Sequence, residues 1–247
     1  SFYREGLGVA QDYKKAFEYY KRAADLGNTF GMLSLGSFYR EGLGVAQDYK
    51  KAFDWYKKAA DLDNPDGMLW LGVFYRDGTG VPQDYKKAFE WYKKAVDCGN
   101  IDWIYELGSF YHEGLGVAQD YKKAFECYKK AADLDNPDGM LLLGDFYRGG
   151  TGVPQDYKKA FEWYKKAADL GNSYGMYELG VCYREELGVP QDYKKAFEWY
   201  KKAADLGNSY GMYELGVCYR EGLGVLKDEK KAKYWFNKAI ENGYKEE

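Results

Sequence analysis

The sequence has few of the residues that most often carry out chemistry. Its 247 residues include one histidine, His112, and four cysteines, none of them in a CxxC pair. Zinc sites and thiol redox sites need such ligands in clusters. His112 stands where five other repeats described below have arginine, so we interpret it as a surface cation and not as a catalytic base. We therefore predict no metal, no cofactor and no enzymatic activity.

The scattered cysteines favour free thiols over disulfides. Two of them, Cys182 and Cys218, take positions at which equivalent repeats have phenylalanine, as a small core hydrophobe does. Free thiols are typical of a reducing compartment, which favours a cytoplasmic location. The other two are Cys98 and Cys127.

A strong charge of one sign and long apolar runs are missing as well. Lys and Arg number 36 against 39 Asp and Glu, for a formal net charge of -3. A protein that neutralises nucleic-acid phosphates or anionic lipid needs a basic surplus. The apolar runs are too short to span a membrane, and the opening residues SFYREG lack the pattern of a signal peptide. Neither a nucleic-acid partner nor membrane insertion is predicted.

What the sequence does contain is a repeat of constant period. An aspartate recurs every 36 residues without insertion or deletion, and such self-similarity predicts a solenoid whose repeats bury their core against their neighbours. We expect a single repeat domain over 1–247. It consists of a partial repeat (1–27), full repeats at 28–63, 64–99, 100–135, 136–171, 172–207 and 208–243, and a polar tail (244–247). The aspartates are Asp12, Asp48, Asp84, Asp120, Asp156, Asp192 and Asp228.

Each aspartate predicts the start of a helix, here called helix B. Its carboxylate can accept the unpaired N–H groups of the first turn, and an amphipathic run such as YKKAF follows it. One B helix is expected from Tyr49 to about Leu62, with Ala52 and Tyr56 on its buried stripe and its lysines toward solvent.

A second helix, helix A, precedes helix B in each repeat. Asn64, Pro65 and Asp66 predict its start, because they supply an N-cap, a proline in the first helical position and a first-turn charge. It is expected to end near Arg76, before glycines that favour the left-handed conformation. Two short helices per period, with no strand signal, predict an all-α, right-handed α-solenoid of antiparallel helix pairs.

A glycine inside each A helix needs an explanation, because it costs about 1 kcal/mol relative to alanine. Gly36 is one example. We expect helix B to approach closely at this point, with small residues such as Ala52 and Ala59 facing the gap.

Several elements together resemble the Sel1-like repeat family. They are LGxxY at 35–39, GxGV at 42–45, Asp48, and the KA, WY and KAA elements of the helix at 49–60. Tetratricopeptide repeats share LGxxY but have a period of 34, and their connection is shorter. The resemblance covers essentially the whole chain. It implies a non-catalytic scaffold, as in signalling, membrane-protein degradation complexes and contacts between bacteria and hosts.

The third repeat departs from the others. Five repeats have glycine near the start of helix A, where the family commonly has alanine, but the third has Trp103. It also has Val96, Cys98 and Cys127 in place of alanine, leucine and tryptophan. Our hypothesis is volume compensation, because an added indole needs room nearby.

Two loop patterns have weak likenesses to ligand sites, and we exclude both. DLDNPDG at 61–67 and 133–139 has proline and aspartate where a calcium loop needs a ligand and glycine. The GxGV loops lack a third glycine at phosphate-loop spacing, and they follow a helix instead of a strand.

Function in a solenoid is expected where positions vary while the packing positions stay fixed. The variable positions form one stripe along each helix A, and by resemblance to related solenoids this stripe lines the concave surface. Its aromatic, arginine and carboxylate groups suit a protein or peptide partner. Alternatively, some of them pack against the adjacent A helix and belong to the core. The candidate partner-binding residues are Phe30, Ser34, Ser37, Arg40, Asp66, Trp70, Val73, Arg76, Asp102, Tyr105, Glu106, His112, Asp138, Leu142, Asp145, Arg148, Tyr174, Tyr177, Glu178, Arg184, Tyr210, Tyr213, Glu214 and Arg220.

The leading hypothesis is therefore a scaffold or adaptor that holds a protein or peptide on the A-helix stripe. The alternative is a structural or self-assembling element, natural or designed, that associates end to end through its terminal repeats. Solution mass over a concentration series separates the two, because an assembling element grows.

Overall fold

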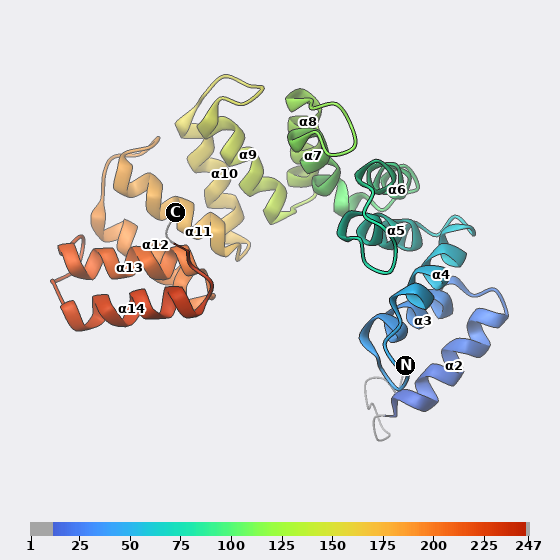
Figure 1. Ribbon diagram of the computed structural model, residues 1–247. Coiled ribbons are helices and arrows are strands. Elements are labelled where there is room, and N and C mark those ends of the chain that lie inside the picture. The colour runs from blue at the N-terminus through green and yellow to red at the C-terminus, as the bar shows by residue number, and fades with distance from the viewer. Residues whose placement is uncertain (1–11, 246–247) are drawn as a thin grey trace. The chain divides into compact units, whose positions relative to one another are not determined.

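The computed structural model describes residues 12–245, which form thirteen α-helices and one short 3-10 helix and contain no strand (Figure 1). The A helices are α3 (Thr29–Glu41), α5 (Pro65–Asp77), α7 (Ile104–Glu113), α9 (Pro137–Gly149), α11 (Ser173–Glu185) and α13 (Ser209–Glu221). The B helices are α2 (Tyr13–Asp25), α4 (Tyr49–Ala60), α6 (Tyr85–Asp97), α8 (Tyr121–Asp133), α10 (Tyr157–Asp169), α12 (Tyr193–Asp205) and α14 (Glu229–Glu241).

The chain folds as two compact units that divide between Asp120 and Tyr121. In the first unit, the described helices α2 to α7 pack against one another in chain order, and in the second unit α8 to α14 do so. This packing confirms the all-α helical solenoid that the sequence predicts.

The predicted helix ends are confirmed to within two residues. Asp48 Oδ1 accepts the backbone N–H of Lys51 at 3.0 Å, and Asn64 Oδ1 accepts that of Gly67 at 3.0 Å. The A helices end in a left-handed residue such as Gly42, with φ 71°. Helix α4 ends at Ala60, two residues before the predicted Leu62.

The glycines inside the A helices do face a closely packed B helix, but the predicted contact atoms are wrong. A Cβ added to Gly36 would lie 2.4 Å from Cε1 of Tyr56, so the glycine makes room for a tyrosine ring and not for Ala52 or Ala59. Alanine contacts belong instead to the glycine near the helix start. There, a Cβ on Gly67 would meet the N atom of Ala60 at 2.7 Å and Cβ of Ala59 at 2.9 Å.

The cysteines behave as the sequence predicts. All four are free thiols, and Cys182 and Cys218 are buried in the core. Burial raises the pKa of both thiols to about 12, which makes them unreactive at neutral pH.

Trp103 changes the start of its A helix. Residues Ile101–Trp103 form a 3-10 turn, α7 begins only at Ile104, and Asn100 makes no side-chain cap. The steric reason is visible at Gly67, the equivalent residue one repeat earlier, where a Cβ would meet backbone atoms of helix B. An indole cannot take that place, so the first turn shifts. The contact of Trp103 with Cys98 and Cys127 stays a prediction.

Replacing Trp103 with glycine should restore the regular first turn. Asn100 would then cap the helix as Asn64 does, and a cap of this kind is worth about 1 kcal/mol. We expect amide hydrogen exchange around residue 103 to slow by about fivefold, while exchange at the equivalent turn of α5 stays unchanged. Unchanged exchange at residue 103 would show that the tryptophan does not cause the altered turn.

Candidate partner-binding surface

Six of the charged candidates pair with one another between successive A helices. Arg76 Nη1 donates to Glu106 Oε2 at 3.2 Å. The same contact joins Arg148 to Glu178 and Arg184 to Glu214, again 30 residues apart. We call these three contacts the Arg–Glu pairs. They lie partly buried between neighbouring repeats, so much of the stripe's charge holds the stack together.

Burial also changes the acid-base behaviour of the glutamates in two of these pairs. It raises the pKa of Glu178 to about 7, even though Arg148 and its hydrogen bond favour the charged form. The pKa of Glu214 is raised for the same reason. For Glu178 and Glu214, desolvation therefore outweighs the attraction of the guanidinium.

The first arginine of the series contacts an aromatic ring on the next A helix, at the position where the Arg–Glu pairs have a glutamate. The guanidinium of Arg40 lies 4.0 Å from the ring centroid of Trp70. Tyr56 also stacks on that ring, with centroids 5.3 Å apart. The Trp70 ring therefore packs against Arg40 and Tyr56 within the solenoid. This agrees with the alternative hypothesis, in which some residues of the stripe belong to the core.

The acidic candidates at the helix starts bridge repeats too. Asp66 Oδ1 accepts the Nδ2 amide of Asn100 at 2.7 Å, and Asp138 Oδ1 accepts that of Asn172 at 2.8 Å. Both asparagines therefore tie their repeat to the A helix before, and Asn172 also caps its own helix through the backbone N–H of Gly175. Tyr174 replaces the aspartate in the next repeat, and the Nδ2 atom of Asn208 is buried without a partner among residues 12–245.

A second bridge depends on the residue in the middle of helix A. Tyr164 donates its hydroxyl to Asp145 Oδ1 at 2.8 Å. The corresponding residue for Tyr200 is Val181, and within the described chain the buried Tyr200 hydroxyl has no acceptor.

Two tyrosine-to-phenylalanine changes should therefore differ in their effect on stability. Tyr164→Phe removes a hydrogen bond to a charged group and should cost about 1.5 kcal/mol. Tyr200→Phe removes a buried hydroxyl without an acceptor and should be neutral or stabilising. Urea unfolding of the two variants measures the difference. Equal losses would mean that the Asp145 contact contributes nothing.

The remaining candidates are placed as follows. Ser34 is only 5% exposed and lies beneath the surface, so it drops out as a contact residue. Phe30 is exposed, whereas Ser37, Val73, Tyr105, His112 and Leu142 are half-buried. The side chain of Asp102 lies outside the described residues.

The second unit carries a continuous group of tyrosines that sequence reasoning did not connect. Tyr174 and Tyr210 have ring centroids 6.3 Å apart, and Tyr177 lies 5.7 Å from Tyr210. Tyr244 lies 5.6 Å from Tyr210 and stacks on Tyr213 at 4.3 Å. We call these five residues the tyrosine cluster. Tyr244 was assigned to a polar tail, but its ring packs here.

Two rings of the tyrosine cluster are exposed to solvent. Tyr174 is 51% exposed and Tyr210 is 46% exposed. Tyr177 is more deeply set, and burial raises its pKa to about 12. The exposed rings of Tyr174 and Tyr210 therefore belong to a packed group that also contains Tyr177, Tyr213 and Tyr244. Such a group presents a large, rigid contact area.

Comparison with known families identifies the repeat. The Sel1 repeat model matches residues 1–28, 29–64, 65–100, 104–136, 137–172, 173–208 and 209–244. This chain belongs to the Sel1 repeat family. The fourth match begins at 104 and leaves out 101–103, the residues of the 3-10 turn that contains Trp103. The local change in this Sel1 repeat is therefore visible both in the family match and in the structure.

Solved Sel1 repeat structures match over most of this chain. One is c5321, a protective antigen of uropathogenic Escherichia coli strains, at 37% identity and a TM-score of 0.81 over 98% of this chain. This chain spans about half of that protein, 52% of its length. Another is a Sel1 repeat protein from Oxalobacter formigenes, at 31% identity and a TM-score of 0.87, covering 92% of this chain and 91% of that one.

A more distant match shares the fold alone. The immunity protein Pa5087 from Pseudomonas aeruginosa is 22% identical, with a TM-score of 0.56 over 83% of this chain and 81% of that one. No curated protein matches the sequence.

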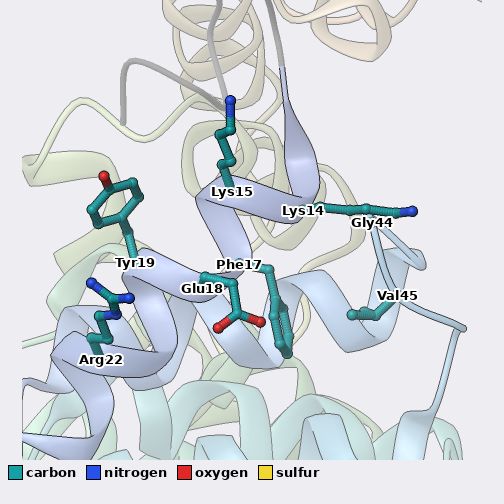
Figure 2. A pocket seen from close by; sticks show the side chains of 8 residues that line it. All are labelled: Lys14, Lys15, Phe17, Glu18, Tyr19, Arg22, Gly44 and Val45. Carbon is teal, nitrogen blue, oxygen red and sulfur yellow. The ribbon is translucent and has the colours of Figure 1, made fainter.

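The Sel1 repeats also form a pocket of about 520 Å³ beside α2, which the sequence did not predict. Figure 2 shows Lys14 and Lys15 pointing in different directions along its rim, with Phe17 on another side. Since the cations do not converge on one point, we do not treat it as an anion site. Over residues 12–245, no cluster of three or more His, Cys, Asp or Glu could hold a metal. No helix in that range is long and apolar enough to cross a bilayer.

Proposed function

We propose that this Sel1 repeat chain is a non-catalytic scaffold or adaptor that binds a protein or peptide through its A helices. The observation that carries the proposal is the tyrosine cluster of the second unit. Tyrosine rings are among the groups that dominate binding energy at protein interfaces, and two rings of this cluster are exposed. The partner would lie across α11 and α13 and contact Tyr174 and Tyr210 directly.

Several features support this surface over the other face of the helices. The B-helix faces are covered by lysines and acids in local ion pairs, such as Lys57 with Asp61 at 2.8 Å. Such exposed pairs contribute little to stability or recognition. On the A helices the variable positions differ in shape and chemistry from repeat to repeat, which is what selectivity requires.

The test compares two double variants. Peptides that bind the wild-type chain are selected from a displayed random library, and their affinities are measured against Tyr174→Ala/Tyr210→Ala and against Tyr157→Ala/Tyr193→Ala. The second pair changes tyrosines of the same unit on B helices, each 39% exposed. We expect the first variant to lose at least about tenfold in affinity and the second to be unchanged. These changes avoid Trp70, Tyr105 and Tyr177, whose rings are half-buried in packing contacts.

Equal affinity for the wild-type chain and the first variant would remove the tyrosine cluster as the binding surface. Urea unfolding of both variants is the control, because Tyr210 packs on the rings of Tyr177 and Tyr244 and the Tyr157 hydroxyl accepts from Gln155. A loss of affinity counts only in a variant that is fully folded under the conditions of the binding assay.

A further inference from the structure

The second unit has a groove beside the turn that joins α8 to α9. Its volume is about 380 Å³, and residues of that turn, of α9 and of the last turns of α10 line it. We call it the turn groove. Its apolar residues are Met140, which is buried, Trp163, which is half-buried, and Leu170, which is 50% exposed. Together they form a surface on which an apolar side chain of a partner can pack.

Charged groups line the same groove. Asp133 and Asp135 come from the end of α8 and the turn after it, Asp169 comes from the end of α10, and all three side chains are exposed. The cation in the groove is Lys166, whose Nζ lies 3.8 Å from the ring centroid of Trp163. Three carboxylates and one ammonium group leave a surplus of negative charge. A hollow with such a surplus attracts ligands of the opposite sign.

The three carboxylates have no cation of their own. Among residues 12–245, none of them forms an ion pair or a side-chain hydrogen bond. The equivalent aspartates of the first unit differ, because Asp61 Oδ2 lies 2.8 Å from Lys57 Nζ and Asp97 Oδ2 lies 2.8 Å from Lys93 Nζ. The sequence has a lysine at the same spacing in both units. In the turn groove, therefore, a partner's cation has no internal ion pair to displace.

The equivalent turns lack this combination of residues. The next repeat has Gly171 in place of Asp135, and the corresponding turn of the first unit has Cys98 in place of Leu170. Asp135 adopts φ 57°, in the left-handed region where Gly171 has φ 86°. Glycine adopts this conformation more easily than aspartate does. The third carboxylate therefore stands at a position where the backbone favours glycine, beside an apolar residue that the first unit does not have.

We propose that the turn groove binds a cationic segment of a partner protein, which packs one apolar side chain on the apolar residues and places a cation on either side of it. Alternate side chains of an extended segment point the same way, so the pattern Arg-x-Leu-x-Arg presents one leucine between two guanidinium groups. One guanidinium pairs with Asp133 or Asp135, and the other pairs with Asp169. The occupant is cationic because the groove has a surplus of unpaired carboxylates. The argument uses no residue of the tyrosine cluster and is independent of the proposed function.

The probe is a fluorescein-labelled peptide, Gly-Arg-Thr-Leu-Thr-Arg-Gly, in which the threonines favour an extended backbone. Its binding to the full chain is followed by fluorescence anisotropy at low ionic strength, because salt screens exposed charges. We expect saturable binding that weakens about fivefold in Asp135→Gly and about fivefold in Leu170→Gln. Asp63→Gly and Leu206→Gln are the matched controls, since they change the equivalent positions of other repeats, and both should bind as the wild type does.

Urea unfolding separates lost contact from lost folding. Asp135→Gly places glycine in a left-handed conformation, so this variant should unfold at the same urea concentration as the wild type or at a higher one. A variant that is at least as stable as the wild type and binds the probe more weakly has lost a contact and not its fold.

Two further peptides test the two parts of the pattern. Gly-Glu-Thr-Leu-Thr-Glu-Gly should show no saturable binding, and Gly-Arg-Thr-Ser-Thr-Arg-Gly should bind about fivefold more weakly than the probe. The proposal is overturned if the probe does not bind saturably, if Asp63→Gly weakens binding as much as Asp135→Gly does, or if either further peptide binds as tightly as the probe. None of these variants alters Tyr174 or Tyr210, so this proposal and the proposed function can fail separately.

Discussion

Replacing Gly180 with alanine should destabilise the second unit by about 3 kcal/mol. An added Cβ would lie 2.4 Å from Cε1 of Tyr200, a ring that is fully buried and packed on its other sides. Alanine is the better helix former by about 1 kcal/mol, so propensity and packing oppose each other here. We expect packing to win, because a buried ring cannot move by the ångström that is needed.

Gly171→Ala is the matched control. Gly171 has φ +86° and no atom within 4 Å of an added Cβ, so its loss should reflect backbone conformation alone, about 1 kcal/mol. Urea unfolding of the two variants gives the comparison. A Gly180→Ala variant that gains stability would mean that the glycine is not required by the Tyr200 ring.

Removing Arg148 should cost much more than neutralising Glu178. Arg148→Ala leaves the carboxylate of Glu178 without its cation, and we expect a loss of about 2 kcal/mol at pH 8. This is below the ~3–5 kcal/mol typical of fully buried pairs, because the Arg148 side chain is 36% exposed. Glu178→Gln keeps an oxygen for Arg148 and should change stability by less than about 1 kcal/mol.

The pH dependence separates charge from geometry. Because the folded-state pKa of Glu178 is about 7, above the ordinary 4.5, the folded chain binds this proton more tightly than the unfolded chain does. Its contribution to stability therefore falls as the pH rises from about 4.5 to about 7. Glu178→Gln should remove this part of the pH dependence, and Arg148→Ala should cost less at pH 5 than at pH 8. Equal cost at both pH values would contradict a raised pKa.

The fold could be predicted because residues next to each helix determine where that helix begins and ends. An aspartate or asparagine before an amphipathic run and a glycine after it need no knowledge of the neighbours. Asp48, Asn64 and Gly42 therefore gave the correct elements. The displaced start of α7 could not be predicted in this way, because it depends on how closely the preceding helix B approaches Trp103.

The division of the stripe into packing and free residues was harder to predict. Helical spacing places Arg76 and Glu106 on one stripe but does not show that they meet. A signal was nevertheless present within the single sequence. Each of the three arginines that is followed by glutamate 30 residues later forms a pair, whereas Arg40 is followed by Trp70 and stacks on it.

The tyrosine cluster depends on ring positions in two successive A helices and on Tyr244. Because the last of these follows the final helix, no helical pattern connects it with the others. The stacking of Tyr244 on Tyr213 is a tertiary contact, and helix propensities carry no information about such contacts.

Site-specific photo-crosslinking tests the binding surface most directly. A photoreactive phenylalanine analogue is placed at position 174, 210, 157 or 193, and each protein is irradiated with a bound peptide from the displayed library. The proposed function predicts crosslinks from positions 174 and 210 and none from 157 and 193. Crosslinks from 157 or 193, with none from 174 and 210, would place the partner on the B helices and contradict it.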